Sequence, residues 1–207
     1  IANDGKWNMM IMDHKNSIIK QINSRINAVK RLQNGDTKTK LMVATAVVQS
    51  KLQYLMPLWG GAPDYLLHAL QVQQLKAARL VWGYESYYWS TEKLLSKCNW
   101  LSIKQQVFYS TCVLAHSIVS TTSPYHIYTG LVHNGSHYNT RAAAAGGQVT
   151  RFHTWEAYGG HSSLTLGSFR CRAQRYYSSL PADVRTGSMA VVKSRLRKHV
   201  WSHVPIR

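Results

Sequence analysis

Apolar residues recur at helical spacing through most of the first 120 residues. The first periodic stretch covers residues 15–33 and is followed by Asn34-Gly35, a pair that typically ends a helix. Lys20 and Arg31 fall opposite its apolar face and Lys30 lies on its flank, so we expect these cations to be solvated. The predicted apolar face consists of Ile18, Ile22, Ile26, Val29 and Leu32.

Two further amphipathic helices are predicted before residue 84. The second helix begins after Asp36, a predicted N-cap, and stops at Pro57. The third begins at Asp64, which we also interpret as a cap, and ends at Gly83, with Trp59-Gly60-Gly61 as the turn between the two helices. Their predicted apolar faces are Leu41, Ala44, Val48, Leu52 and Leu55, then Leu66, Leu70, Ala77, Leu80 and Val81.

A short helix and a long helix are predicted next. We interpret Ser90 as the N-cap of the short helix rather than as the nucleophile of a Ser90-x-x-Lys93 motif, because the companion motifs of serine acylases are absent. Ser102 and Gln105 form a capping box that opens the long helix. Only Lys104 is charged in that helix, so it is either central in the fold or covered by a protein partner. Its predicted apolar face is Ile103, Val107, Leu114 and Ile118.

The periodic pattern stops in residues 121–167, where Ser, Thr, His, Gly and four consecutive alanines maintain no helical or strand period. We expect an irregular connection with a turn of helix after Pro124. Order returns in residues 168–207, and a terminal helix begins near Ser188. We therefore predict a mainly α fold in three parts, a helical region (1–120), an irregular connection and a small basic C-terminal helical segment. The apolar face of the terminal helix is predicted as Met189, Val192, Leu196 and Val200.

The charge balance of the 207 residues is strongly basic. Lys and Arg number 25 against eight Asp and Glu, which gives a net charge of +17. A surplus of one sign repels itself unless a polyanion neutralises it, so we predict a nucleic-acid partner. The predicted binding residues are Lys20, Lys30, Arg31, Arg141, Arg170, Arg172, Arg175, Arg185, Lys193, Arg195, Arg197 and Lys198.

Aromatic residues alternate with arginines between Tyr138 and Tyr177. Arginine contacts phosphates and stacks on bases, and aromatic rings stack on unpaired bases. We interpret Phe169, Tyr177 and Leu180 as the core of the last helical unit, and the arginines of this stretch as the polyanion-binding groups.

The titratable residues do not predict an enzyme. No two of the eight carboxylates lie closer than seven positions, so a metal-dependent phosphoryl-transfer site is not expected. His133 with His137 and His199 with His203 have the spacing of a zinc-binding helix, but neither pair has a Cys or carboxylate near it in sequence. We interpret these histidines as surface or nucleic-acid contacts and predict no catalytic residue, metal ligand or cofactor in this chain.

The cysteines and the hydropathy of the chain predict a reducing compartment and no membrane span. The three cysteines are widely spaced and form no C-x-x-C motif, so neither a disulfide framework nor a zinc ribbon is predicted, and a reducing intracellular compartment is expected. Residues 105–140 carry no charge, but Pro124 and Gly130 interrupt them and their apolar runs are short. A membrane span needs about 20 apolar residues, so none is predicted.

Short motifs follow one another along residues 14–200 in a fixed order. They are His14-x3-Ile18-x3-Ile22, Arg31-Leu32, Tyr54, Pro57, Trp59-Gly60, Gln74, Ala77-Ala78-Arg79, Gly83, Leu94-Leu95, Trp100-Leu101, Tyr138-Asn139-Thr140-Arg141, Ser168-Phe169, Leu180-Pro181 with Arg185, Ser188 and Val192-Lys193. This order resembles that of the segment after the catalytic palm in reverse transcriptases of non-LTR (LINE-like, jockey-type) retrotransposons. In this chain Tyr177-Ser178 stands where the family has Trp-Asn, and Val192 where it has Phe.

The resemblance implies a non-catalytic C-terminal part of an RNA-directed DNA polymerase, with a helical thumb-like bundle and a connection that lie on the template–primer duplex. The family's polymerase aspartates lie upstream of this segment, so the chain is not expected to be an enzyme by itself. Its implied partners are RNA, DNA or an RNA–DNA hybrid, and the missing upstream palm and fingers of the same polyprotein. The expected location of the chain is intracellular, in the nucleus. The chain opens on Ile1 rather than Met, in keeping with a piece of a longer protein. The alternative is a stand-alone basic α-helical nucleic-acid-binding or protein-adaptor module.

Overall fold

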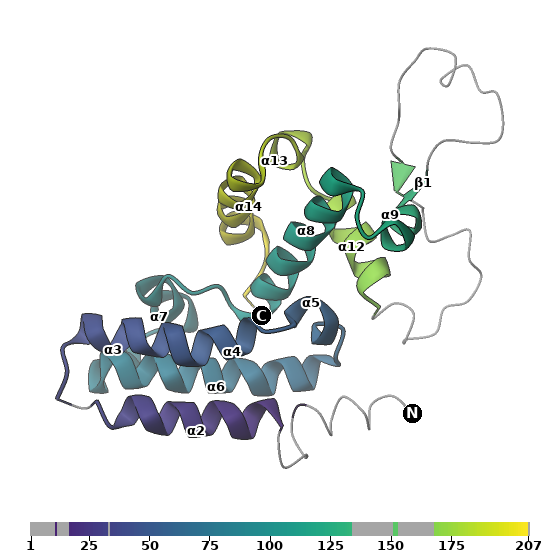
Figure 1. The fold of residues 1–207 in the computed structure, drawn as a ribbon. Helices are drawn as coiled ribbons and strands as arrows, with labels where there is room; N and C mark the ends of the chain where they lie inside the picture. The colour runs from purple at the N-terminus through teal and green to yellow at the C-terminus, as the bar shows by residue number, and fades with distance from the viewer. Residues whose placement is uncertain (1–10, 12–16, 33, 134–150, 153–167, 207) are drawn as a thin grey trace, which may run out of the picture. The chain divides into compact units, whose positions relative to one another are not determined.

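The protein is mainly α-helical, as the periodicity predicted (Figure 1). It divides into two compact units, of which unit 1 contains Ile1–Val107 with Val204–Arg207 and unit 2 contains Phe108–His203. The boundary between the units falls inside the long helix rather than after residue 120. A computed structural model describes residues 11, 17–32, 34–133, 151–152 and 168–206.

Unit 1 is built on three helical rods that lie side by side (Figure 1). In chain order, the second rod contains a π-helical turn between two α-helical stretches, and the short helix α7 packs on the third rod. The rods are α2 (Ile18–Lys30), then α3 (Thr37–Ala44) with η2 (Thr45–Gln49) and α4 (Ser50–Gln53), and then α6 (Asp64–Trp82).

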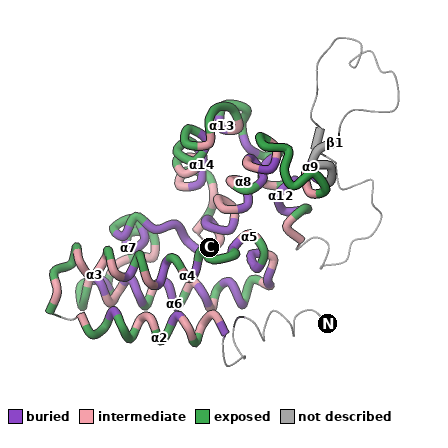
Figure 2. The backbone as a smooth tube through the Cα atoms, viewed as in Figure 1, coloured by how far each residue is buried: buried purple, intermediate pink, exposed green. Residues whose placement is uncertain are grey.

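The facing sides of these rods carry the apolar positions (Figure 2). Full burial of one such aliphatic side chain contributes about 1.5–3 kcal/mol, so this shared core is the main reason that the rods associate. The buried residues of the predicted faces are Ile22, Val29, Ala44, Val48, Leu52, Leu66, Leu70, Ala77 and Val81.

One of the two predicted carboxylate caps is present. Asp36 accepts a hydrogen bond from the backbone N–H of Thr39 (3.2 Å), and bonds from Thr39 lower the pKa of its carboxyl group. The prediction for Asp64 is wrong, because Pro63 occupies the cap position and Asp64 is the first helical residue. At this position the positive end of the helix dipole stabilises the Asp64 carboxylate. The carboxylate also forms an ion pair with Lys104 (3.3 Å).

The predicted second helix ends earlier than Pro57. Tyr54 is extended and Leu55 adopts a left-handed conformation (φ 53°), which leaves the Leu55 side chain exposed rather than on the apolar face. Pro57 instead lies in the first turn of a new short helix, α5 (Met56–Trp59), where its missing N–H costs nothing. Trp59 is buried, and its Nε1 donates to the Tyr54 carbonyl oxygen (2.8 Å), so this residue belongs to the core rather than to a simple turn.

The predicted end of α6 and the predicted start of α7 are both confirmed. Gly83 ends α6 with φ 72°, a conformation that glycine adopts without strain. The 3₁₀ helix η3 (Tyr84–Tyr88) leads to α7 (Thr91–Cys98). Ser90 accepts a hydrogen bond from the backbone N–H of Lys93 (3.2 Å), and it is therefore the N-cap of α7.

A buried glutamine network joins α6 to the chain that enters the long helix α8 (Ile103–Thr121). Gln74 is fully buried, and its Nε2 donates to Gln49 Oε1 (3.2 Å) and to the Leu101 carbonyl oxygen (2.9 Å). Its Oε1 accepts from Gln71 Nε2 (2.9 Å). Every one of these buried amide groups would otherwise be desolvated without compensation, so the network holds this junction in one arrangement.

The start of α8 is the capping box expected from the sequence. The Ser102 N–H donates to Gln105 Oε1 (3.0 Å), and the Gln105 N–H donates to Ser102 Oγ (3.3 Å). Gln105 Nε2 also donates to the carbonyl oxygen of Val204 (2.9 Å), which connects the last residues of the chain to unit 1.

Unit 2 contains the rest of α8 and the basic C-terminal helices. Residues 121–167 were predicted to be irregular apart from a turn of helix after Pro124. That helix is present directly after Pro124, and 134–150 and 153–167 lie outside the described residues. A two-residue antiparallel pairing joins Val132 to Phe152 and His133 to Arg151. The elements after α8 are α9 (Tyr125–Leu131), β1 (Val132–His133), β2 (Arg151–Phe152), α12 (Phe169–Ser178), α13 (Ala182–Arg185) and α14 (Met189–His203).

The uncharged helix α8 is covered by its own chain. Within unit 2 it packs against α12 through the Phe108 and Tyr176 rings, whose centroids are 4.8 Å apart. The predicted apolar face is confirmed at Ile103, Val107 and Ile118 and is wrong at Leu114, which is 38% exposed. The buried apolar residues of α8 are Ile103, Val107, Cys112, Ala115 and Ile118.

Candidate nucleic-acid interface

The predicted binding residues of α2 lie on the surface of unit 1. Lys20, Lys30 and Arg31 are exposed, and Ile22 and Val29 are buried on the opposite face. Lys20 and Arg31 share one side of the helix and are separated along its axis by about 16 Å at 1.5 Å per residue. The sequence periodicity is therefore sufficient to place these three cations.

Arg25 of α2 is less exposed than Lys20, Lys30 and Arg31. It is half-buried, and its Nη1 donates to the Val47 carbonyl oxygen in the π-helical turn η2 (2.7 Å). This charge-assisted bond joins α2 to the rod formed by α3, η2 and α4, so Arg25 has a structural role in unit 1.

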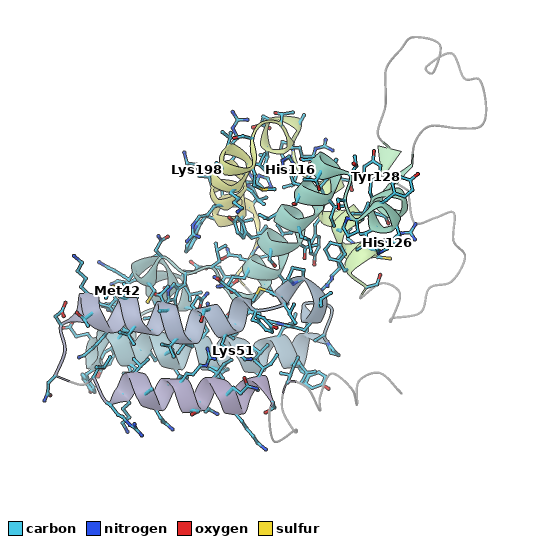
Figure 3. All side chains as sticks on the ribbon, in the orientation of Figure 1. Met42, Lys51, His116, His126, Tyr128 and Lys198 are labelled. Carbon is cyan, nitrogen blue, oxygen red and sulfur yellow. The ribbon has the colours of Figure 1, made fainter. Side chains whose placement is uncertain are left out.

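The terminal helix α14 has the predicted apolar face, with Val192, Leu196 and Val200 buried and Met189 half-buried. Its cations do not share one side. At 100° per residue, Lys193 and Arg197 lie on one flank of the buried face, Arg195 lies on the other flank, and Lys198 lies nearly opposite the buried face. The exposed members are Lys193, Arg195 and Lys198, of which Lys198 is labelled in Figure 3, while Arg197 is half-buried.

Arg195 and Arg185 also make contacts inside unit 2. Arg195 Nη1 donates to the carbonyl oxygens of Asp183 (2.6 Å) and Thr186 (3.3 Å), and it thus satisfies the C-terminal end of α13. Arg185 is half-buried close to Tyr177, where its charge partly opposes the rise in the Tyr177 pKa that burial causes. The hydrogen bonds of Arg195 therefore connect α14 to the end of α13 within unit 2.

The predicted arginine group of α12 does not form a common face. Arg170 and Arg175 are exposed, but Arg172 is only 4% exposed, so its prediction as a surface binding residue is wrong. Helical geometry turns Arg172 about 200° from Arg170, toward the interior of unit 2. Burial lowers the pKa of its guanidinium group. Arg141, the remaining predicted binding residue, lies outside the described residues.

The aromatic residues predicted for the core of the last helical unit have mixed positions. Tyr177 and Leu180 are buried, as predicted, and Phe169 is half-buried. His116 of α8, labelled in Figure 3, lies beside Tyr177, and its Nδ1 shares a hydrogen bond with the Tyr177 hydroxyl group (2.9 Å). The other ring nitrogen, Nε2, lies 3.3 Å from Ser120 Oγ.

The histidine pair of the terminal helix is stacked. The ring centroids of His199 and His203 are 4.5 Å apart, and His203 Nδ1 lies 3.2 Å from the His199 carbonyl oxygen. Burial and the neighbouring His203 lower the pKa of His199. In the part of the chain that the structure describes, no three His, Cys, Asp or Glu residues form a group able to hold a metal ion.

Acidification is expected to destabilise unit 2 through His116. Burial lowers the His116 pKa below its ordinary value of 6.5, so below that pH the unfolded chain binds more protons than the folded chain. The contribution of neutral His116 to the free energy of unfolding should therefore be fully present above pH 6.5. It should decrease as the pH is lowered from 6.5 toward the pKa of His116 in the folded chain. His116→Gln should weaken this dependence, as measured by urea unfolding between about pH 5 and pH 8.

The same substitution at His68, an exposed residue of α6, controls for the loss of one imidazole group. Identical pH profiles for the wild type and His116→Gln would contradict the assignment of this dependence to His116. Because the lowered pKa of His199 acts in the same direction, a residual slope is expected in the variant.

The sequence analysis assigned no role to the stretch between Gly83 and Ser90. The structure exposes the side chains of Tyr84, Tyr87 and Tyr88 by 75%, 67% and 77%. The sequence contains a signal for this exposed cluster. Three tyrosines occur within five residues, and their spacing fits no helical or strand period that would bury them together.

Comparisons of the chain with protein-family models, with curated proteins and with solved structures find no match. Within the described residues, no helix combines the length and the apolar character that a membrane crossing requires.

Proposed function

We propose that this chain is the non-catalytic C-terminal part of a retrotransposon RNA-directed DNA polymerase, and that it binds the template–primer backbone through a basic surface. The order of sequence motifs that resembles the post-palm segment of non-LTR reverse transcriptases supports this proposal. The observation that carries it is the exposure of cations on helices with few acidic neighbours. Unit 2 has ten Lys and Arg in its sequence against two acids, and Arg170, Arg175, Lys193 and Lys198 are exposed.

The chemistry of these cations suits a phosphate backbone. Lysine and arginine neutralise phosphates and release the condensed counterions, which provides affinity without base recognition. In this function Lys193 and Lys198 contact the backbone from α14, and Lys20, Lys30 and Arg31 contact it from α2. The polymerase aspartates and any metal ions that they hold belong to the upstream palm.

The alternative function is a stand-alone basic module that docks a protein through α8. The burial of α8 by its own chain argues against this docking mode, because the uncharged face that suggested it is already occupied. A basic nucleic-acid-binding module without a polymerase upstream remains the second candidate. An upstream reading frame that encodes a polymerase palm distinguishes the first candidate from it.

The proposal is tested by titrating the full chain against fluorescently labelled DNA duplex, RNA–DNA hybrid and single strands at several salt concentrations. We expect sequence-independent binding whose logarithm falls linearly with the logarithm of salt, by about 0.9 for each phosphate neutralised on duplex. The same preparation should extend no primer in the presence of Mg²⁺. Absence of binding at low salt, or affinity that does not change with salt, would contradict the proposed function.

A further inference from the structure

Hydrogen bonds of the buried residue Ser86 hold the segment from Gly83 to Trp89 in one conformation. Ser86 is fully buried, and its hydroxyl group lies within hydrogen-bond distance of the carbonyl oxygens of Gly83 (2.6 Å) and Arg79 (3.3 Å). The Trp89 N–H donates back to the Ser86 carbonyl oxygen (3.3 Å). The 3₁₀ helix η3 is thus fixed to the end of α6 by its one buried side chain, and its other residues face outward.

Three of those outward residues are Tyr84, Tyr87 and Tyr88, which we name the tyrosine platform. Tyr84 contacts the other two rings, with centroid separations of 6.4 Å to Tyr87 and 5.7 Å to Tyr88, and the Tyr84 and Tyr88 hydroxyl groups are 2.8 Å apart. Each ring is at least 67% exposed. Clustered exposed rings contribute little to the core of unit 1, and such clusters typically mark a contact surface.

Cations lie next to the aromatic rings of this region. The Arg79 guanidinium carbon is 5.7 Å from the centroid of the Tyr87 ring, and Lys93 Nζ is 5.2 Å from that of Trp89, which itself contacts Trp82. These distances are those of cation–π pairs. The charged residues of the surrounding stretch 76–98 are the cations Lys76, Arg79, Lys93 and Lys97 and the acids Glu85 and Glu92.

We propose that the tyrosine platform binds unpaired nucleotides of a single strand by base stacking, with Arg79 and Lys93 close to the backbone phosphates. This inference rests on the proposed function, because it assigns to a nucleic-acid-binding chain a second site of different chemistry. Aromatic faces stack on any unpaired base, and flanking cations supply the charge that the phosphates need.

Stacking distinguishes this site from the basic helices. In a duplex both faces of every internal base are covered by neighbouring bases, so the platform can engage only single-stranded stretches or ends. Tyrosine and arginine are also enriched in protein–protein interfaces. The net positive charge around the platform favours a nucleic acid over a protein as its partner. A protein contact would give a different result in the test below.

The test compares two triple variants of the full chain. Tyr84→Ala with Tyr87→Ala and Tyr88→Ala removes the platform, and Tyr54→Ala with Tyr65→Ala and Tyr125→Ala removes three tyrosines of similar exposure elsewhere. Fluorescence anisotropy measures the affinity of each for a labelled poly-dT single strand and for a blunt DNA duplex. A third variant with phenylalanine at all three platform positions retains the rings, and circular dichroism verifies that each variant is folded.

We expect the platform variant to lose about tenfold to a hundredfold in single-strand affinity, the effect of removing one or two stacked bases, while its duplex affinity stays within about twofold. The phenylalanine variant and the Tyr54/Tyr65/Tyr125 variant should bind the single strand like the wild type. Crosslinking of a 5-iodouracil single strand to the wild-type chain should map to the platform peptide.

Each of the following results overturns the inference. The platform variant with wild-type single-strand affinity would overturn it, as would equal losses in the two alanine variants. A wild-type chain that binds duplex but no single strand would overturn the inference and leave the proposed function intact, whereas failure to bind any nucleic acid would contradict both. If the platform variant instead loses self-association in size-exclusion chromatography with its nucleic-acid binding unchanged, the platform is a protein interface.

Discussion

Replacing Lys193 and Lys198 together with alanine is expected to weaken the binding of every duplex to a similar extent, by on the order of fiftyfold at 0.1 M salt. Each lost phosphate contact reduces the slope of log affinity against log salt by about 0.9, so two contacts reduce it by about 1.8 over the tenfold range from 1 M to 0.1 M. Both lysines are exposed on α14, and the ammonium group of neither has a hydrogen-bond or ion-pair partner among the described residues. The measurement is anisotropy titration at four or more salt concentrations.

The matched control is the double variant Lys38→Ala with Lys76→Ala, which changes the net charge equally through two exposed lysines of unit 1. A general loss of positive charge would weaken binding in both double variants, whereas a local contact weakens it only in the α14 variant. Base-specific loss in the α14 variant would indicate groove recognition, and an unchanged slope would exclude α14 from the interface.

Arg195 provides a second comparison on the same helix. Its guanidinium group is committed to the carbonyl oxygens of Asp183 and Thr186, so its removal should loosen the connection between α13 and α14 as well as remove a charge. A variant that combines it with Lys198 would mix the two effects. Lys193 and Lys198 are therefore the substitutions that isolate the electrostatic contribution.

Gln74→Ala is expected to lower the free energy of unfolding of unit 1 by about 3–5 kcal/mol. The substitution leaves a cavity at a fully buried position of α6 and removes the partner of Gln49 Oε1 and of Gln71 Nε2. Gln74→Met fills the space but makes no hydrogen bond, so it isolates the polar contribution of about 1–3 kcal/mol. Urea denaturation followed by circular dichroism measures both values.

Gln73 supplies the internal control on the same helix. It is also buried, but its Oε1 has no hydrogen-bond partner in the part of the chain that the structure describes. Gln73→Met should therefore be neutral or stabilising, because it removes a buried polar atom that is not compensated. Equal destabilisation by Gln73→Met and Gln74→Met would show that the hydrogen bonds of Gln74 contribute no net stability.

Local features of the chain were predictable because their causes are local. An amphipathic period places Ile22 and Val29 inside and Lys20 and Arg31 outside whatever the neighbouring helix is. A capping box requires only Ser102 and Gln105, since both of its hydrogen bonds close within four residues. For the same reason the caps at Asp36 and Ser90 and the glycine stop at Gly83 were correct.

The role of each cation depended on contacts that no local pattern contains. Arg172 and Arg175 are the same residue type three positions apart on α12, yet one is buried and the other exposed, because the surrounding helices of unit 2 cover one side of α12 more than the other. Arg25 and Arg195 reach backbone carbonyl groups 22 and 12 positions away. Long, flexible arginine side chains make such partners invisible to a sequence period.

The sequence by itself determined that this protein is mainly α-helical, strongly basic and poor in carboxylates, because periodicity, charge and composition belong to the residues themselves. The tertiary structure alone decided that Leu114 of α8 is exposed while Cys112 and Ala115 are buried, that Arg172 is removed from the surface, and that Ser86 turns inward so that Tyr84, Tyr87 and Tyr88 face outward. These three outcomes depend on which distant segments pack together, and packing selects among faces that the sequence pattern leaves equivalent.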